Sequence, residues 1–290
     1  MRLATRAKIN WTLDILGQRD DGYHLMDMLM QPVTLFDEIT LTPACTLTLT
    51  TGGTPLLPAD EKHLALRAAR ALQARTGCTL GAAIHVEKAI PVGAGMGGGS
   101  ADAAAVLIGL NRLWKLNLSK AELEAIGLTL GADVPFCLRG GLTRTTGIGE
   151  TMADLPCGRC YSLIAVQPCE GLSTKEIFTA YHACTDMPRP DNDRAAQALA
   201  DGDPAGLAAA MGNVMQPVSE ARRPEIIQAI DALLAAGAFA AQMTGSGSAV
   251  IGAFTDADAA NAAFWDIHSR WPKAWRCETC MESVVFADED

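Results

Sequence analysis

The sequence has no apolar run of about 18 residues, the length that a membrane-spanning helix requires. It also shows no signal-peptide core near its start, because Lys8, Asn10 and Asp14 interrupt the hydrophobic runs there. Basic residues are few: 23 Lys and Arg stand against 33 Asp and Glu, and the formal net charge is -10. No dense Lys/Arg run interrupts this acidity, so nucleic-acid binding is disfavoured. We expect a cytoplasmic protein without a membrane partner.

Cysteine is present, but not in the pattern of a secreted disulfide framework. The chain has 9 cysteines, an odd number, spread along its length. Two Cys-x-x-Cys pairs, Cys157/Cys160 and Cys277/Cys280, could supply four thiolates to zinc. The pairs lie far apart in the sequence, whereas zinc ribbons use short spacings. Incidental cysteines are therefore favoured over a zinc site, and any metal site stays unknown at this stage.

Composition and periodicity predict two α+β domains. Hydrophobic residues make up 49% of the chain and charged residues 19%, which is enough apolar surface for a full core. Strands are expected in residues 1–16, as an antiparallel pair within 33–50, and at 84–90, 161–167, 240–243, 249–254 and 276–286. Helices are expected at 60–76, 101–114, 119–131, 173–181, 195–211, 224–237 and 255–270. A linker at 156–159 places the domains at 1–157 and 158–290.

The most informative segment is a glycine-rich loop that leads into a predicted helix. Five glycines, Gly93, Gly95, Gly97, Gly98 and Gly99, precede Ser100, which we expect to be the N-cap of that helix. Glycines let the backbone approach a ligand closely, and a helix N-terminus offers free N–H groups and positive charge. This combination predicts an anion site, most often for a phosphate chain.

The loop also resembles two known types of nucleotide-binding loop, each imperfectly. Gly93-x-Gly95-x-x-Gly98 fits the dinucleotide fingerprint of nicotinamide-dependent oxidoreductases, although a strand-rich segment precedes it and no βαβ repeat follows. A Walker A loop would have a lysine after the glycines, and this chain has Ser100 and Ala101 there, which excludes that type. Dinucleotide binding and a purely structural loop stay open as alternatives.

Two further segments offer parts for phosphoryl transfer, which needs positioning, charge neutralisation and a group that orients the nucleophile. Lys8 and Asn10 lie two positions apart, on one face of a predicted strand. Asp133 stands among small and apolar residues shortly before Pro135, where a carboxylate needs a partner or a function. A solvated lysine and a turn aspartate are the plain alternatives.

Taken together, residues 91–100, 131–135 and 243–249 resemble motifs of the GHMP kinase superfamily. Within it, residues 7–10, 17–24 and 97–100 resemble members that phosphorylate a cytidyl diphosphate sugar alcohol. The resemblance implies an N-terminal domain of ribosomal S5 domain 2-like type and a ferredoxin-like C-terminal domain. It also implies transfer of the ATP γ-phosphoryl group to the 2-hydroxyl of 4-diphosphocytidyl-2-C-methyl-D-erythritol, a step of non-mevalonate isoprenoid biosynthesis.

The resemblance also implies roles for individual residues. Asp133 would orient the substrate hydroxyl, and Lys8 would keep Asp133 ionised and stabilise the transferred group. The substrate would be bound by Asn10, Tyr23, His24 and Phe178, with the cytosine stacked between Tyr23 and Phe178. Mg²⁺ is expected to bridge the phosphates. The ATP phosphates would be held by Pro91, Val92, Gly93, Ala94, Gly95, Met96, Gly97, Gly98, Gly99, Ser100 and Ala101.

The chain departs from the family pattern at several positions. Ala101 stands where a second serine is common, and Val214 and Gln216 replace two carboxylates. The pair Asn192-Asp193 resembles half of that acidic motif but lies upstream of it. The alternatives are a homoserine or mevalonate type of GHMP kinase, and a nucleotide-binding module without catalysis. A monomer or a homodimer is expected.

Overall fold

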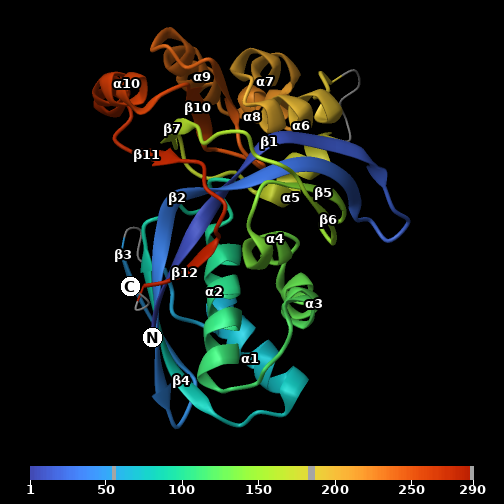
Figure 1. Cartoon of the computed structure of the whole chain (residues 1–290), viewed down its shortest axis with the longest axis vertical. Coiled ribbons are helices and arrows are strands. Elements are labelled where there is room, and N and C mark those ends of the chain that lie inside the picture. Colours follow the sequence, from blue (N-terminus) through green and yellow to red (C-terminus); the bar gives the residue numbers. More distant parts are fainter. Residues whose placement is uncertain (54–56, 182–186, 288–290) are drawn as a thin grey trace.

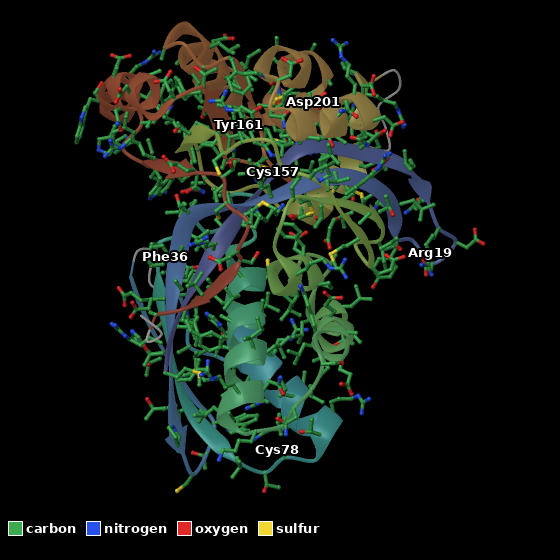
Figure 2. All side chains as sticks on the ribbon, viewed as in Figure 1. Arg19, Phe36, Cys78, Cys157, Tyr161 and Asp201 are labelled. Atoms are coloured by element: carbon green, nitrogen blue, oxygen red, sulfur yellow. The ribbon has the colours of Figure 1, made fainter. Side chains whose placement is uncertain are left out.

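A long antiparallel hairpin begins the chain in the computed structural model, which describes residues 1–53, 57–181 and 187–287. Strand β1 (Arg2–Gln18) pairs with β2 (His24–Ala44), and the pairing shifts register between Arg6 and Lys8 and at two further places. The tip of the hairpin projects from the body of the molecule, and Figure 2 shows Arg19 there. The shift near Lys8 brings Pro32 opposite this lysine. Pro32 has no N–H to donate to Lys8 O, and its own carbonyl accepts from Cys280 N–H at 2.9 Å. The ladder is therefore interrupted there, and the Lys8 N–H donates to Met96 O at 3.0 Å.

The prediction of two mutually paired strands within residues 33–50 was wrong. The first half belongs to β2, which continues through Pro32, and the second half begins β3 (Thr48–Gly53). Strand β3 pairs in parallel with β4 (Gly81–Lys88) and does not pair with β2. Alternating side chains reveal which residues face the core but not which strand lies alongside, so the sequence could not decide the partner.

The first sheet has the order β12-β1-β2-β4-β3, with further strands paired at its margins. β5 pairs with β2 and β6, and β8 pairs in parallel with β1. The remaining strands of this sheet are β5 (Thr143–Gly147), β6 (Thr151–Asp154), β8 (Gly212–Asn213) and β12 (Val284–Phe286).

Four helices lie between residues 64 and 139, and Figure 1 shows them beside the first sheet. They are α1 (Leu64–Thr76), α2 (Gly98–Leu113), α3 (Lys120–Leu130) and α4 (Val134–Arg139). The predicted capping box of Ser119 and Glu122 is confirmed at the start of α3. The N-cap prediction for α2 was wrong, because the cap is Gly97 at φ 74°, and Ser100 lies in the first turn. A glycine tolerates this left-handed backbone, so the chain enters the helix three residues earlier than a serine cap would allow.

The second sheet has the order β11-β7-β10-β9, with every neighbouring pair antiparallel. Its strands are β7 (Ser162–Val166), β9 (Ala240–Met243), β10 (Val250–Phe254) and β11 (Ala274–Glu278). Helices α9 (Glu225–Ala235) and α10 (Ala257–Arg270) pack against this sheet. The other helices here are α5 (Thr174–Tyr181), α6 (Asn192–Asp201), α7 (Pro204–Ala210) and α8 (Gln216–Arg222). The two sheets with their helices confirm the α+β fold class.

Strands from the second half of the chain join the first sheet. β8 pairs with β1 at Thr12 and Leu13. β12 pairs with β1 at residues 3–5 (β12 in Figure 1). These pairings tie the halves together through backbone hydrogen bonds. The boundary at residue 157 stays a prediction.

The structure brings the two Cys-x-x-Cys pairs near each other, because Cys157 and Cys160 precede β7, the adjacent β11 contains Cys277, and Tyr161 bonds to Thr279 next to Cys280 (Tyr161 and Cys157 in Figure 2). Even so, no group of three or more His, Cys, Asp or Glu within 1–53, 57–181 and 187–287 is arranged to hold a metal ion. Among the helices of these same ranges, none combines the length and apolar character needed to cross a bilayer.

Candidate active site

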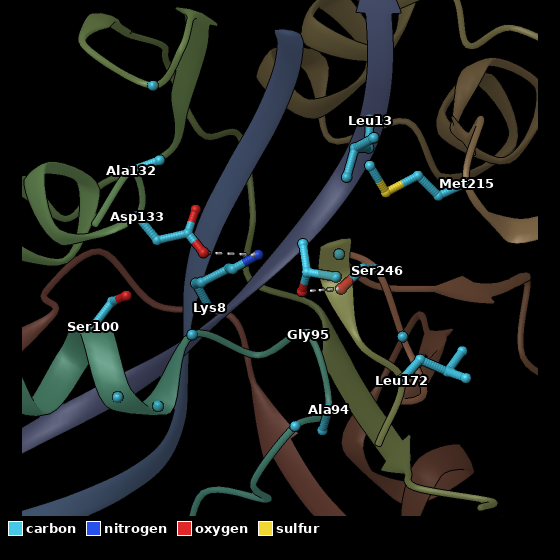
Figure 3. Close-up of a pocket in the computed structure, with 18 of the residues that line it drawn as sticks. Lys8, Leu13, Ala94, Gly95, Ser100, Ala132, Asp133, Leu172, Met215 and Ser246 are labelled. Carbon is cyan, nitrogen blue, oxygen red and sulfur yellow. Dashed lines mark hydrogen bonds and ion pairs between the residues drawn. The ribbon is translucent and has the colours of Figure 1, made fainter. Parts of the chain in front are cut away.

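A cavity of about 570 Å³ opens where the glycine loop, the β1–β2 hairpin and the second sheet meet. Figure 3 shows its centre, with Lys8 and Asp133 directed toward each other and Ser246 on the opposite side, near Gly95. The hairpin contributes Tyr23 and His24 as well as Lys8. One cavity therefore gathers residues from both halves of the chain.

The glycine loop forms one wall of this cavity. Gly93, Gly95 and Gly97 all have φ between 65° and 77°, a backbone conformation that other residues adopt at a cost. The first intrahelical bond of α2 runs from Ala101 N–H to Gly97 O at 2.9 Å. The N–H groups of residues 98–100 precede it and therefore have no partner within the helix. With the helix dipole behind them, these donors suit a phosphate group.

The loop is held in place by a second glycine turn, residues 244–247. A Cβ on Gly95 would lie 2.2 Å from Thr244 O, and a Cβ on Gly245 would lie 2.7 Å from Gly95 O. Ala249 N–H donates to Ala94 O at 3.1 Å. The two turns thus pack backbone against backbone, which requires glycine on both sides.

Lys8 and Asp133 form the charged centre of the cavity. Lys8 Nζ lies 3.8 Å from Asp133 Oδ2, and the side chains are 5% and 36% exposed. The buried lysine also donates to Asn10 Oδ1 at 2.8 Å. The carboxylate thus stays partly open to the cavity, while the ammonium is fixed behind it. The alternative of a solvated strand lysine is wrong, because the strand face that carries Lys8 points inward.

The local chain direction explains why Asp133 is available for chemistry. It follows α3 and its C-cap Gly131, and it is the N-cap residue of α4. In this position its side chain makes no capping hydrogen bond. The helical backbone bonds of α4 therefore hold the residue, while its carboxylate is left for Lys8 and for a ligand.

Asn10 lies behind Lys8 and is fully buried. Its Oδ1 accepts hydrogen bonds from Lys8 Nζ, from Gly245 N–H at 3.1 Å and from Thr244 Oγ1 at 3.5 Å. Asn10 is not among the residues that line the cavity. The structure places it as a connector between the lysine and the second glycine turn; a direct substrate contact by Asn10 stays a prediction.

At the outer end of the cavity, the ring of His24 stacks on Phe178 with 4.3 Å between centroids and 27° between planes. Tyr23 is 59% exposed, next to the turn in which Gly22 N–H bonds to Arg19 O. All three aromatic side chains line the cavity. The structure brings the three predicted residues to one cavity. The ring of His24 covers one side of Phe178, which the sequence-based prediction leaves open for the cytosine.

The loop residues predicted for the nucleotide divide into two groups. Pro91 to Gly95 and Gly97 to Ser100 line the cavity, whereas Met96 and Ala101 are buried beneath it. Sequence reasoning missed Lys88, Leu172, Thr174, Met215 and residues 245–247 as lining residues. The family-like motif at 243–249 could have indicated the last group, but only the fold shows that it faces the glycine loop.

The structure accounts for one departure from the family pattern, the glutamine at position 216. Gln216 Oε1 accepts the Met243 N–H at 2.9 Å, and Asn213 Nδ2 donates to the carbonyls of Met243 and Gly245. An amide at 216 thus supports the second glycine turn without a carboxylate. Asp193 lies elsewhere and pairs with Arg144 at 2.6 Å.

The fold and the site define a kinase of the GHMP family, to which the chain belongs. The profile described as "GHMP kinases N terminal domain" matches residues 63–141, and "GHMP kinases C terminal" matches residues 195–273. Members of this family are ATP-dependent kinases, so the nicotinamide alternative is not supported. The loop and α2 also do not connect two neighbouring parallel strands, because the next strand in the chain, β5, pairs with β2 and β6 and not with β4.

Among its relatives, the chain is 40% identical to 4-diphosphocytidyl-2-C-methyl-D-erythritol kinase of Symbiobacterium thermophilum, over 97% of this chain and 100% of that one. It is 42% identical to the kinase of the same name from Pelotomaculum thermopropionicum, over 88% and 89% of the two chains. A crystal structure of 4-(cytidine 5'-diphospho)-2C-methyl-D-erythritol kinase superposes with a TM-score of 0.82 at 30% identity, covering 96% of this chain and 99% of that one. Homoserine kinase of Cytophaga hutchinsonii shares the fold, with a TM-score of 0.77 at 18% identity over 98% and 96% of the chains.

Proposed function

We propose that the protein transfers the γ-phosphoryl group of ATP to the 2-hydroxyl of 4-diphosphocytidyl-2-C-methyl-D-erythritol, giving the 2-phosphate and ADP. The observation that carries the proposal is the ion pair of Lys8 and Asp133, 3.8 Å long, in the same cavity as the glycine loop. The relatives named above, which match nearly the whole chain, carry this activity in their names. Homoserine and mevalonate types share the fold only, at under 20% identity.

In this proposal the glycine loop and the first turn of α2 bind the ATP phosphates through backbone N–H groups. Asp133, which is partly exposed to the cavity, accepts or orients the proton of the substrate hydroxyl. The Lys8 ammonium pairs with the Asp133 carboxylate and stabilises charge that develops on the transferred phosphoryl group. Asn10 fixes Lys8 through its 2.8 Å hydrogen bond.

The cytidine end of the substrate would lie at the aromatic side chains. Tyr23 is exposed beside the cavity and can stack on the base, while His24 can reach the base edge. Because His24 already covers Phe178, the base either takes the place of the His24 ring or uses the remaining face of Phe178. Stacking on one aromatic ring contributes on the order of 1–3 kcal/mol.

Magnesium fits this site as a companion of the nucleotide rather than as a resident ion. Within the described ranges, no cluster of three acidic, histidine or cysteine side chains is arranged to hold an ion without the nucleotide. Mg²⁺ needs few protein ligands when it bridges phosphate oxygens and keeps several waters. When bound, it would neutralise charge on the phosphates. We also propose a cytoplasmic location, and a monomer or a homodimer in solution.

The test is a measurement of ADP release with ATP, Mg²⁺ and a panel of alcohols. The panel contains the cytidyl methylerythritol compound, homoserine and mevalonate, and ³¹P NMR identifies the product. We expect turnover with the cytidyl compound alone and a new phosphomonoester on its 2-hydroxyl. Turnover with homoserine or mevalonate, and none with the cytidyl compound, would overturn the proposal.

A further inference from the structure

Beneath the first turn of α2 lies a buried ion cluster that the catalytic centre does not use. Lys88 Nζ bonds to Asp37 Oδ2 and lies 2.8 Å from Asp102 Oδ2, and all three side chains are almost fully buried. Lys88 comes from the end of β4, Asp37 from β2 and Asp102 from α2. The three charged residues therefore come from three different elements, and only the fold brings them into contact.

This cluster lies against the phosphate-binding end of α2. A Cβ on Gly98, the first residue of α2, would lie 3.2 Å from Lys88 Nζ, and Lys88 also lines the cavity. Asp102 is four residues after Gly98, on the same side of the helix. Any net charge on the cluster is therefore felt by a phosphate bound at the N–H groups of residues 98–100.

The two carboxylates are not equivalent. Asp37 accepts the N–H groups of Ala89 and Ile90 at 2.7 and 2.8 Å on one oxygen and Lys88 Nζ on the other, so both of its oxygens have partners. Asp102 has one oxygen on Lys88, while its Oδ1 is buried without a hydrogen-bond partner. An unpaired buried carboxylate oxygen is costly when charged and much less so when the group is protonated.

We propose that the Asp37–Lys88–Asp102 cluster is part of the nucleotide site, and that ATP binds more tightly when Asp102 carries a proton. With that proton the cluster is neutral, and without it the cluster carries one negative charge under the phosphates. The inference rests on the proposed function only in taking the glycine loop as the phosphate site. Burial, opposed by Lys88 and aided by Asp37, raises the pKa of Asp102 to about 8.

The other groups around Asp102 do not change charge in the same range. Burial lowers the pKa of Lys88, but Asp102 and Asp37 together raise it by more, so Lys88 stays charged. Burial and then Lys88 lower the pKa of His63, which is neutral above pH 7. Burial, and then Asp133 and Asp102, raise the pKa of the Cys137 thiol far above its usual range.

The phosphates of ATP are fully ionised above about pH 7.5, because their last pKa is about 6. Lys8, beside Gly97, and Asp133, which pairs with Lys8 at 3.8 Å, are further charged groups near the start of α2.

The experiment measures the dissociation constant of ATP, without the second substrate, by calorimetry at pH 7.0 and 9.5. In the wild-type protein we expect binding to weaken by about five- to tenfold, the effect of one charge about 8 Å from a phosphate in a partly screened site. In Asp102→Asn the ratio between the two pH values should be close to one. Asp27→Asn is the matched control, a buried, ion-paired aspartate. Burial raises the pKa of Asp27, but Arg144 and Asn192 together lower it by more. Asp27 therefore stays charged at both pH values, and Asp27→Asn should keep the wild-type ratio of dissociation constants.

Two further measurements keep the proposal testable if Asp102→Asn folds poorly. Wild-type protein titrated with ATP at pH 8.5, in buffers of different ionisation enthalpy, should take up a fraction of a proton. The double variant Lys88→Gln/Asp102→Asn should bind ATP about tenfold more weakly than Asp102→Asn at every pH, because Asp37 is then left alone. Binding that is independent of pH in wild type, without proton uptake, would overturn the inference, as would absence of ATP binding. Failure of the proposed function appears separately, as ATP binding with normal pH dependence but no phosphorylation of the cytidyl compound.

Discussion

Replacing Gly95 by alanine tests whether the two glycine turns must touch for the kinase to work. The added Cβ would lie 2.2 Å from Thr244 O and 3.1 Å from Gly247 N. Real Cβ atoms do not come within 3.0 Å of a neighbouring atom, so the turns have to separate by nearly an ångström. The second turn carries the N–H of Gly245, which bonds to Asn10 Oδ1 at 3.1 Å. The displacement therefore reaches Lys8 through Asn10.

The expected loss of activity and stability in Gly95→Ala follows from two separate energetic costs. The left-handed backbone at Gly95, with φ 77°, penalises alanine by about 1–2 kcal/mol. The clash adds about 1–3 kcal/mol of strain or is relieved by moving the loop. A misplacement of about 1 Å in a catalytic site lowers the rate on the order of a hundredfold. We therefore expect kcat/KM for ATP to fall about a hundredfold, together with a lower melting temperature.

Gly93→Ala is the matched control, in the same loop with φ 65°, because its Cβ would meet only Gly171 Cα at an ordinary 3.4 Å. Gly77→Ala, with φ 69° and no atom within 4 Å, reports the backbone strain alone at the C-cap of α1. Steady-state kinetics and thermal unfolding of the three variants give the comparison. We expect Gly93→Ala to lose less than about tenfold in kcat/KM, as the strain alone predicts. If Gly95→Ala and Gly93→Ala behave alike, the contact between the turns has no part in catalysis.

Three further predictions concern single residues. Asp133→Asn should lower kcat by about 10²–10⁴-fold while ATP still binds in calorimetry, and near-normal turnover would remove Asp133 from the chemistry. Tyr23→Ala should raise KM for the cytidyl substrate about tenfold and KM for ATP less than about twofold, and equal effects would contradict stacking on the base. Burial raises the pKa of Asp102 from 3.8 to about 8, so in this range the native state holds a proton that the unfolded chain has released. Urea unfolding should therefore show stability falling as pH rises from about 4 to 8, and less steeply in Asp102→Asn; an identical slope would refute this assignment.

The local chemistry of the site could be predicted from the sequence because it depends on neighbouring residues. The glycine loop, the capping box at Ser119 and the aspartate before α4 each follow from short-range rules. The start of α2 was misplaced, since Ser100 satisfies the rule for an N-cap but Gly97 can adopt φ 74° and begin the helix earlier. Strand partners were also misjudged within residues 33–50, because pairing is a long-range choice.

Other parts of the site needed the tertiary structure. Asn10 bonds to Gly245, which is 235 positions away in the chain, and its contact with the substrate stays a prediction. The ion cluster was invisible for the same reason, since Lys88 and Asp37 are 51 positions apart. A buried aspartate in the apolar start of α2 was the only local sign of it.

The amino-acid sequence alone determined the elements that bind a phosphate chain, the charged residues available for catalysis and the family resemblance. Backbone conformation and helix capping decide these features over a few residues, and such short-range preferences can be inferred from composition and spacing. Only the tertiary structure decided that Lys8 meets Asp133, that one glycine turn packs on the other, and that a buried cluster lies under the phosphate loop. These contacts depend on strand pairing and on the packing of helices against sheets, where residues distant in the chain come within a few ångströms of one another.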